Sequence, residues 1–247
     1  MKISIITIVY NNRETIADAI ESVLSQTYPN IEYIVVDGLS TDGTVEVVKS
    51  YGDRITRFVS EKDKGLYDAI NKGIKMATGD VIGLLHSDDV FYSPDAIEKV
   101  AGAFKSKNTD SVYADLLYVQ KEDTNKVVRN WVSGSYQRDN FLYGWMPPHP
   151  TFYVKKSCYE QYGLYNTLFK SAADYELMLR FLYKYKVSTC YIPEKLVKMR
   201  VGGKSNVTLK NRIRANREDY NAWLINDLQP RFYTRYLKPL RKLTQFL

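Results

Sequence analysis

The chain has 247 residues, of which 45% are hydrophobic and 26% charged, a balance typical of a folded globular protein rather than a disordered one. Its net charge is +7, yet nine basic and three acidic residues between 210 and 247 supply +6 of this, so the rest is nearly neutral. That distribution argues against a nucleic-acid groove spread over the domain. No apolar run approaches the roughly 20 residues that span a bilayer. Two distant cysteines, Cys158 and Cys190, favour a reduced, cytoplasmic protein.

The first 105 residues alternate between predicted strands and predicted helices. Apolar runs predict strands over 3–9, 32–36, 55–59 and 80–86. Apolar residues at helical spacing predict helices over 13–27, 44–51, 65–76 and about 95–105. This rhythm is typical of βαβ units and predicts an α/β fold with a mostly parallel, doubly wound sheet flanked by helices.

The pattern changes after residue 110. We expect a hairpin over 111–120 and 126–132, an aromatic and proline-rich loop over 133–150, a strand over 151–154, a helix over 172–186 and a strand over 187–192. With neither a repeat nor a low-complexity linker in view, we expect one domain over 1–208. A basic amphipathic helical extension is expected over 209–247.

Acids recur at the ends of the predicted strands. Asp88 and Asp89 end one apolar run, and Asp37 ends another. The carboxyl ends of parallel strands line one crevice in a doubly wound sheet, so these acids share an edge with residues 7–11. Adjacent carboxylates repel each other unless a cation lies near them, and a divalent metal on a diphosphate is the simplest one. A cap for the helix that follows is the competing interpretation.

Two common phosphate-binding motifs are absent from the sequence. There is no GxGxxG after the first strand and no GxxxxGK[ST], which argues against a dinucleotide fingerprint and a P-loop. A nucleotide site without either loop typically holds its phosphates through a metal. Asp88 and Asp89 are the candidate residues for such a metal site.

Five segments in order resemble motifs of the family 2 glycosyltransferases: TIVYN (7–11), DGLSTDGT (37–44), EKDKGLYDAINKG (61–73), GDVIGLLHSDD (79–89) and SAADYELMLR (171–180). The resemblance covers nearly the whole chain. A sixth segment, MRVGGKSN (199–206), is similar to bacterial polysaccharide-biosynthesis members of the family. The resemblance implies a GT-A fold, with a Rossmann-like sheet, and an inverting transfer of sugar from a nucleotide-sugar donor.

The resemblance also implies a nucleotide site. Asp37 matches an acid that hydrogen-bonds uracil, so a UDP-sugar is the expected donor. The other matched nucleotide-side residues are Thr7, Tyr10, Asn11, Asp63, Lys64, Asp68 and Asp88, the last as a ribose contact. For Asp68, a solvated or capping role stays open. Gly203 and Lys204 lie in a segment expected to close over the diphosphate, with Lys204 near phosphate.

A metal ligand is implied at the end of the acid pair. Asp89 matches the residue that would coordinate Mg²⁺ or Mn²⁺ at the diphosphate. The position two before Asp88 is often Asp in the family, but here it is His86. A neutral imidazole can hydrogen-bond a ribose or ligate a metal, but it adds no negative charge. A plain histidine at the strand end is the alternative.

Asp174 is the candidate catalytic residue, because it matches the family's general base. Such a base takes the proton from the acceptor hydroxyl and is typically worth about 10²–10⁴-fold in rate. Glu176 lies some 200° away around the expected helix, so both acids cannot face the site. An N-cap is the competing role for Asp174. Trp145 and His149, with His86, are expected on the acceptor or leaving-group side, although a packed aromatic or a buried histidine would explain them equally.

The basic tail favours contact with a membrane surface, because it interleaves basic and aromatic residues in one amphipathic helix. The expected partners are a nucleotide-sugar donor and a sugar or lipid-linked oligosaccharide acceptor, at the inner face of the plasma membrane. Packing on the domain and a homodimer contact are the alternatives for the tail. Two other functions stay open: a metal-dependent sugar nucleotidyltransferase and a noncatalytic nucleotide-sugar binding protein.

Overall fold

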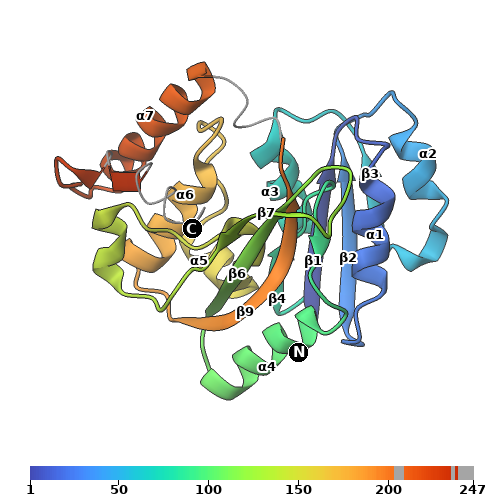
Figure 1. Cartoon of the computed structure of the whole chain (residues 1–247), viewed down its shortest axis with the longest axis horizontal. Coiled ribbons are helices and arrows are strands. Elements are labelled where there is room, and N and C mark those ends of the chain that lie inside the picture. The colour runs from blue at the N-terminus through green and yellow to red at the C-terminus, as the bar shows by residue number, and fades with distance from the viewer. Residues whose placement is uncertain (203–208, 235–236, 239–247) are drawn as a thin grey trace.

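The computed structural model describes residues 1–202, 209–234 and 237–238 (Figure 1). Its strands are β1 (Ile3–Val9), β2 (Ile31–Asp37), β3 (Arg57–Ser60), β4 (Val81–Leu84), β5 (Val90–Phe91), β6 (Ser111–Val119), β7 (Val127–Trp131), β8 (Tyr153–Lys155) and β9 (Thr189–Arg200). Its α-helices are α1 (Ile16–Leu24), α2 (Thr44–Lys49), α3 (Leu66–Met76), α4 (Ala96–Lys107), α5 (Lys156–Tyr162), α6 (Ala173–Met178) and α7 (Leu209–Ile225). Short helical turns are η1 (Gly52–Arg54), η2 (Arg138–Tyr143), η3 (His149–Thr151) and the π-turn η4 (Leu179–Lys184).

The strands form one sheet in the order β3-β2-β1-β4-β8-β6-β9-β5, with β7 paired to β6. From β3 to β4 every pairing is parallel, as two neighbouring βαβ units require. The second half is mixed: β6 and β9 are parallel, whereas β8 runs antiparallel to both β4 and β6. The prediction of a mostly parallel sheet therefore holds for the first half only.

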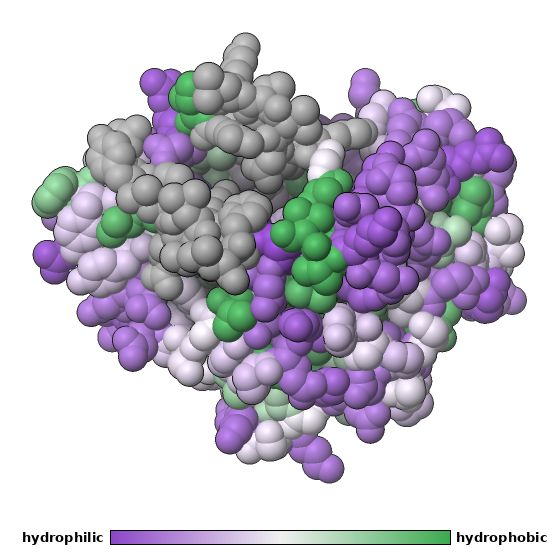
Figure 2. All heavy atoms as spheres, in the orientation of Figure 1, coloured by the Kyte–Doolittle hydropathy of each residue, from purple (hydrophilic) through white to green (hydrophobic). Residues whose placement is uncertain are grey.

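The central strands are buried on both faces, and their side chains alternate between two cores. On β1, Ile3 and Ile5 enter the core beneath α1, α2 and α4, whereas Ile6 and Ile8 enter the core beneath α3, α5 and α6. This explains why these strands read as continuous apolar runs. The surface over α1 and α2 is largely hydrophilic, while a hydrophobic band crosses the region of the β6–β7 hairpin, where Val127, Val128 and Val132 are exposed (Figure 2).

The helix α7 packs against the domain, and its amphipathic pattern serves that packing. Trp223 is 1% exposed, and its Nε1–H donates to the hydroxyl of Tyr175 on α6 at 2.9 Å. Asn226, just after α7, donates to Glu176 at 3.0 Å. Of the helical extension predicted over 209–247, the structure shows α7 as far as Ile225, and one face of this helix packs on the domain. In the described part of the chain, no helix is both long and apolar enough to cross a bilayer.

A buried carboxylate ties the amino ends of the first strands together. Glu32 on β2 is 1% exposed and accepts hydrogen bonds from the Ser4 hydroxyl at 2.6 Å and from the Thr78 backbone N–H at 2.7 Å. Burial alone would raise the pKa of Glu32, but the hydrogen bonds from Ser4 and Thr78 and the charge of Lys2 outweigh it and lower the pKa to about 2.

The lowered pKa predicts how stability depends on pH. Because the unfolded chain binds this proton more readily, the stabilising contribution of Glu32 is complete above about pH 4.5 and is lost as pH falls toward 2. Glu32→Gln is therefore expected to lower the melting temperature at pH 7, and the difference from the wild type should narrow below pH 4.5. Melting curves between pH 7 and 2 test this, and a difference that stays constant would contradict it.

Candidate active site

The loops after β1 and β2 are bonded to each other at the carboxyl edge of the sheet. The backbone N–H of Asn11 donates to the Ser40 hydroxyl at 2.8 Å, and the Asn11 side-chain oxygen accepts from the Thr41 N–H at 2.8 Å. Asn11 has a φ of 48°, a left-handed conformation that Asn tolerates better than most residues. Next to it, Tyr10 is 57% exposed. These two predicted nucleotide residues therefore line the edge.

Two other predicted nucleotide residues are buried. Thr7 is fully buried, and its hydroxyl bonds to Tyr33 at 3.1 Å, so we leave it out of the proposed site. Asp37 is also fully buried and accepts from the Ser40 N–H at 3.0 Å and from the Ser60 hydroxyl at 2.6 Å. In this structure Asp37 shapes the loop that borders the site.

Tyr10, Gly38 and Asp63 lie close together at this edge. A Cβ atom at Gly38 would lie 2.9 Å from the Asp63 carboxylate and 3.3 Å from the Tyr10 ring, so glycine permits this approach. Asp63 accepts from Lys72 at 2.6 Å. Burial raises the pKa of Asp63 despite this bond. The Asp63 carboxylate and the exposed ring of Tyr10 therefore lie side by side next to Gly38.

Of the remaining residues predicted on the nucleotide side outside the acid pair, two are described by the structure and two are not. Lys64 is exposed, and its backbone N–H donates to Asp68 at 3.0 Å, so Asp68 on the first turn of α3 is bonded to the loop that precedes the helix. Gly203 and Lys204 lie outside the described residues. Their roles stay predictions.

The acid pair splits into an accessible and a buried member. Asp88 is partly exposed, whereas Asp89 is fully buried. Oδ1 of Asp89 accepts from the Arg200 backbone N–H at 3.2 Å, and Oδ2 has no hydrogen-bond partner among the described residues. Burial, and then the charge of Asp88, raises the pKa of Asp89 well above its usual value. A buried, unpaired carboxylate oxygen beside a second carboxylate is a donor set that suits a hard divalent cation.

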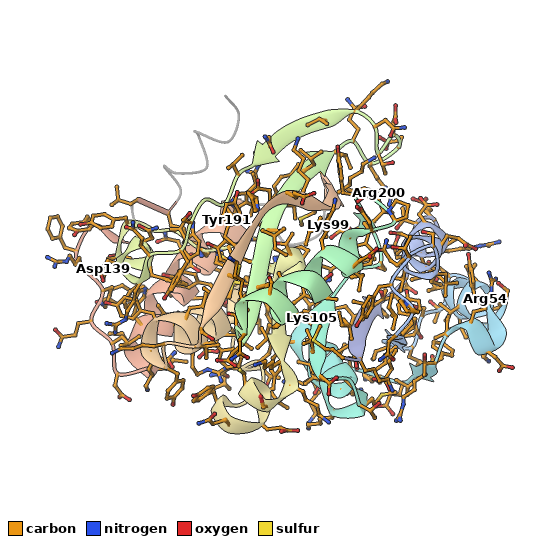
Figure 3. The ribbon with its side chains drawn as sticks, turned by 90° about the horizontal axis from the view of Figure 1, so that it is seen from below. Arg54, Lys99, Lys105, Asp139, Tyr191 and Arg200 are labelled. Carbon is orange, nitrogen blue, oxygen red and sulfur yellow. The ribbon has the colours of Figure 1, made fainter. Side chains whose placement is uncertain are left out.

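Arg200 holds this pair from the end of β9 (Figure 3). Its guanidinium donates to the backbone carbonyls of Asp88 at 2.8 Å and Lys121 at 2.9 Å, and it pairs with Asp18 on α1. A planar guanidinium can satisfy several acceptors at once from one rigid fork. Arg200 therefore fixes the backbone of the acid pair against three other segments of the chain.

Asp174, on the first turn of α6, lies at the other side of the site. Its side chain is 22% exposed. The Tyr67 hydroxyl donates to Oδ1 of Asp174 at 3.4 Å, and burial raises the pKa of Tyr67, so this hydroxyl keeps its proton. Nδ1 of His149 lies 3.6 Å from Oδ2 of Asp174. Asp174 thus combines partial access to solvent with two contacts from the protein.

The two histidines connect the acid pair to Asp174. Nε2 of His86 lies 2.8 Å from Nε2 of His149. Burial, and then the neighbouring His149 ring, lowers the pKa of His86 to about 4, and burial lowers that of His149 to about 4. Both rings are therefore neutral near pH 7. The structure brings His86, His149 and Asp174 together, although they lie far apart in the sequence.

Glu176 and Trp145 are structural. Glu176 is 2% exposed and pairs with Arg180 at 2.8 Å, which agrees with the expectation that it faces away from Asp174. Trp145 is 4% exposed, packs edge-on against Tyr113 and donates from Nε1 to the Ser133 carbonyl at 2.8 Å. Because its ring is buried and its N–H is already bonded inside the core, we do not place Trp145 against a substrate.

A carboxylate from α7 organises the loop that leads into α6. Glu218 accepts backbone N–H bonds from Lys170, Ser171 at 2.7 Å and Ala172 at 3.0 Å. Sequence reasoning counted Glu218 only as an acid in the tail and passed over Tyr67 and Arg200. Each of these contacts joins residues far apart in the chain, so no local pattern signals them.

Glu218→Ala is expected to remove these bonds, to cost about 1–3 kcal/mol of stability and to lower turnover, because unsatisfied N–H groups loosen the start of α6. Melting temperature and turnover measure the two effects. Asn221→Ala, an exposed substitution on the same helix, is the matched control. Wild-type turnover in Glu218→Ala would show that this loop does not position Asp174.

The model of glycosyl transferase family 2 matches residues 4–162. An uncharacterized glycosyltransferase of Rickettsia typhi is 31% identical over 212 residues, covering 81% of this chain and 64% of that protein, so the chain spans slightly less than two thirds of this relative. A PGL/p-HBAD biosynthesis glycosyltransferase of Mycobacterium bovis is 28% identical over 182 residues, covering 72% of this chain and 68% of that protein.

Solved structures show the same fold. TarS 1-349 of S. aureus, in complex with UDP-GlcNAc, superposes with a TM-score of 0.69 at 17% identity, covering 96% of this chain and 70% of that one. The mannosyltransferase PcManGT of Pyrobaculum calidifontis, in complex with GDP-Man and Mn²⁺, gives 0.67 at 17% identity, covering 97% and 68%. These similarities confirm the GT-A fold. Together with the family match over residues 4–162, they lead to one assignment: the chain belongs to glycosyl transferase family 2.

Proposed function

We propose that the chain is an inverting glycosyltransferase that moves a sugar from a nucleoside-diphosphate sugar to a hydroxyl group of a bacterial polysaccharide precursor. One observation carries this proposal. Contacts of 2.8 Å and 3.6 Å run from His86, beside the acid pair, through His149 to Asp174. These contacts support a proposed leaving-group end and a proposed base within one site, as direct displacement at an anomeric carbon requires.

A UDP-sugar is the donor that we propose. The exposed ring of Tyr10 offers a stacking surface for a planar base, and the Asp63 carboxylate lies close to it beside Gly38. Two neighbours of this fold, described with UDP-GlcNAc and GDP-Man, support a nucleoside diphosphate carrier in general. The bonds between Asn11 and the loop of Ser40 and Thr41 would hold the neighbouring Tyr10 in place before the donor binds.

Asp174 is the proposed general base. Its carboxylate takes the proton of the acceptor hydroxyl while that oxygen forms a bond to the anomeric carbon and the bond to the diphosphate breaks. Attack from the face opposite the leaving group inverts the anomeric configuration. Tyr67 and His149 restrict the carboxylate before the acceptor arrives, which lowers the cost of reaching the reactive geometry.

The acid pair is the proposed site for Mg²⁺ or Mn²⁺. Oδ2 of Asp89 is buried without a partner among the described residues, and Asp88 lies beside it with a more accessible carboxylate. The described residues contain no cluster of three or more acids, histidines or cysteines, so the diphosphate itself would complete the coordination. When bound, such an ion offsets the negative charge that develops on the leaving diphosphate.

A donor panel tests the proposed function. Melting temperature is measured with UDP-, GDP- and dTDP-sugars, each with and without Mn²⁺. A UDP-sugar at about 100 times its Kd should stabilise the protein by about 2.7 kcal/mol, or roughly 5–10 °C. Release of pyrophosphate from a nucleoside triphosphate and a sugar phosphate would contradict the proposal and indicate a nucleotidyltransferase. Binding of donors without nucleotide release would indicate a binding protein.

We also propose that the outer face of α7 contacts an anionic membrane surface that carries the acceptor. Ile213, Tyr220 and Leu224 are exposed along one stripe, with Arg217 between them. The protein is expected to co-sediment with vesicles that contain anionic lipid and not with neutral vesicles. Replacing Ile213 and Leu224 with Glu should abolish this, and unchanged sedimentation of that variant would contradict the proposal.

A further inference from the structure

Both ring nitrogens of His149 are directed at protein groups. Nε2 lies 2.8 Å from Nε2 of His86, and Nδ1 lies 3.6 Å from Oδ2 of Asp174. The sequence placed His149 on the acceptor or leaving-group side. A ring whose two nitrogens already face protein atoms has no nitrogen left for a substrate, so its role must act through its neighbours.

The short contact fixes where the protons lie. Two ring nitrogens at 2.8 Å hold one proton between them, because two protons would collide and none would leave two lone pairs facing each other. A neutral His149 has a single N–H. If this were on Nε2, the bare Nδ1 would face the Asp174 carboxylate and repel it. The favourable arrangement therefore puts the His149 proton on Nδ1, toward Asp174, and makes His86 the donor to Nε2.

The backbone holds His149 rigidly. It lies between Pro148 and Pro150 at the start of η3, and both prolines are buried. Proline fixes its own φ and restricts the residue before it. The Thr151 hydroxyl donates to the carbonyl of Ala114 at 2.9 Å, which ties this turn to β6. The ring is thus presented to Asp174 from a stiff part of the fold.

We propose that His149 is a positioning residue for the base, donating from Nδ1 to Oδ2 of Asp174 while His86 fixes its tautomer by donating to Nε2. This inference rests on the proposed role of Asp174. Tyr67 contacts the other carboxylate oxygen at 3.4 Å, so each oxygen has one protein partner and rotation of the carboxylate is restricted. The 3.6 Å contact is longer than a hydrogen bond, and such contacts often shorten only when substrate is bound.

Two substitutions of His149 separate this role from simple packing. Asn places an amide near the position of Nδ1, so His149→Asn keeps a donor for Asp174 and loses the contact with His86. Gln places its amide near the position of Nε2, so His149→Gln reaches His86 and lacks the donor for Asp174. We expect kcat to fall about 10²-fold in His149→Gln and much less in His149→Asn, with the donor KM unchanged in both.

Turnover is followed as UDP release, with melting temperature as the check on folding. His86→Leu removes the group that fixes the tautomer and is expected to lower kcat without changing the donor KM. Equal kcat in the Asn and Gln variants, or a loss confined to the donor KM, would overturn the inference. Asp174→Asn is measured alongside. If it keeps full turnover, the proposed function itself fails. If it is inactive while His149→Gln matches the wild type, only this inference fails.

Discussion

Asp174→Asn is expected to lower the rate of sugar transfer by about 10²–10⁴-fold while donor binding stays unchanged. Asn has nearly the size and shape of Asp, so Tyr67 can still donate to its oxygen and α6 keeps its structure. The substitution removes the negatively charged carboxylate that takes the proton from the hydroxyl of the acceptor. Turnover by UDP release and donor affinity by calorimetry measure the two quantities separately.

Glu176→Gln is the matched control, because it changes an acid two residues further along the same helix. Glu176 is 2% exposed and pairs with Arg180 at 2.8 Å, so its substitution should cost about 3–5 kcal/mol of stability. Turnover per folded molecule should remain close to that of the wild type. If Asp174→Asn kept its turnover while Glu176→Gln lost it, the assignment of the base would be wrong.

Substitutions in the acid pair, Asp88 and Asp89, are expected to have the second large effect, which is on donor affinity. Asp89→Asn should abolish the increase in donor affinity that Mn²⁺ produces, because Oδ2 of Asp89 is the unpartnered oxygen proposed to meet the ion. Asp88→Asn should weaken donor binding with and without Mn²⁺ by about 10-fold to 100-fold, since a hydrogen bond to a charged group is worth about 1.5–3 kcal/mol. Titrations with a UDP-sugar, with and without Mn²⁺, measure both effects.

The two variants also test which acid carries the metal. Asp88 is the accessible member of the pair, and a fully buried Asp89 is the less obvious first contact for an ion. If only Asp88→Asn lost the increase in donor affinity that Mn²⁺ produces, Asp88 rather than Asp89 would be the metal ligand. Glu160→Gln, an exposed substitution on α5, is the control and should change neither affinity.

Much of the first half of the fold was predictable because its strands are buried on both faces. Runs such as Ile3–Val9 leave little choice but a central strand, and the helices between them carry clear apolar spacing. The second half was harder. The two residues of β5 are too few to show a pattern, and α5 has only Cys158 and Tyr159 buried. Pro193 interrupts the pattern of β9, which continues to Arg200.

The sequence predicted which residues lie along one edge of the sheet better than how deeply each of them is buried. Acids at strand ends were expected to share an edge, and the bonds between the loops after β1 and β2 place Asn11 beside Ser40. A strand-end position does not reveal burial: Thr7 and Asp37, which are expected to contact the nucleotide, lie in the interior, and their contact with a ligand stays a prediction. Contacts such as Glu218 with Ser171 depend on how distant segments pack.

The anomeric configuration of the transferred sugar tests the central claim most directly. Proton NMR on the sugar passed to an acceptor, or released to water in the first turnovers, reads this configuration before it can equilibrate. Direct displacement assisted by Asp174 predicts an anomer opposite to that of the donor. A retained configuration would require a covalent or other double-displacement route, and would contradict the account.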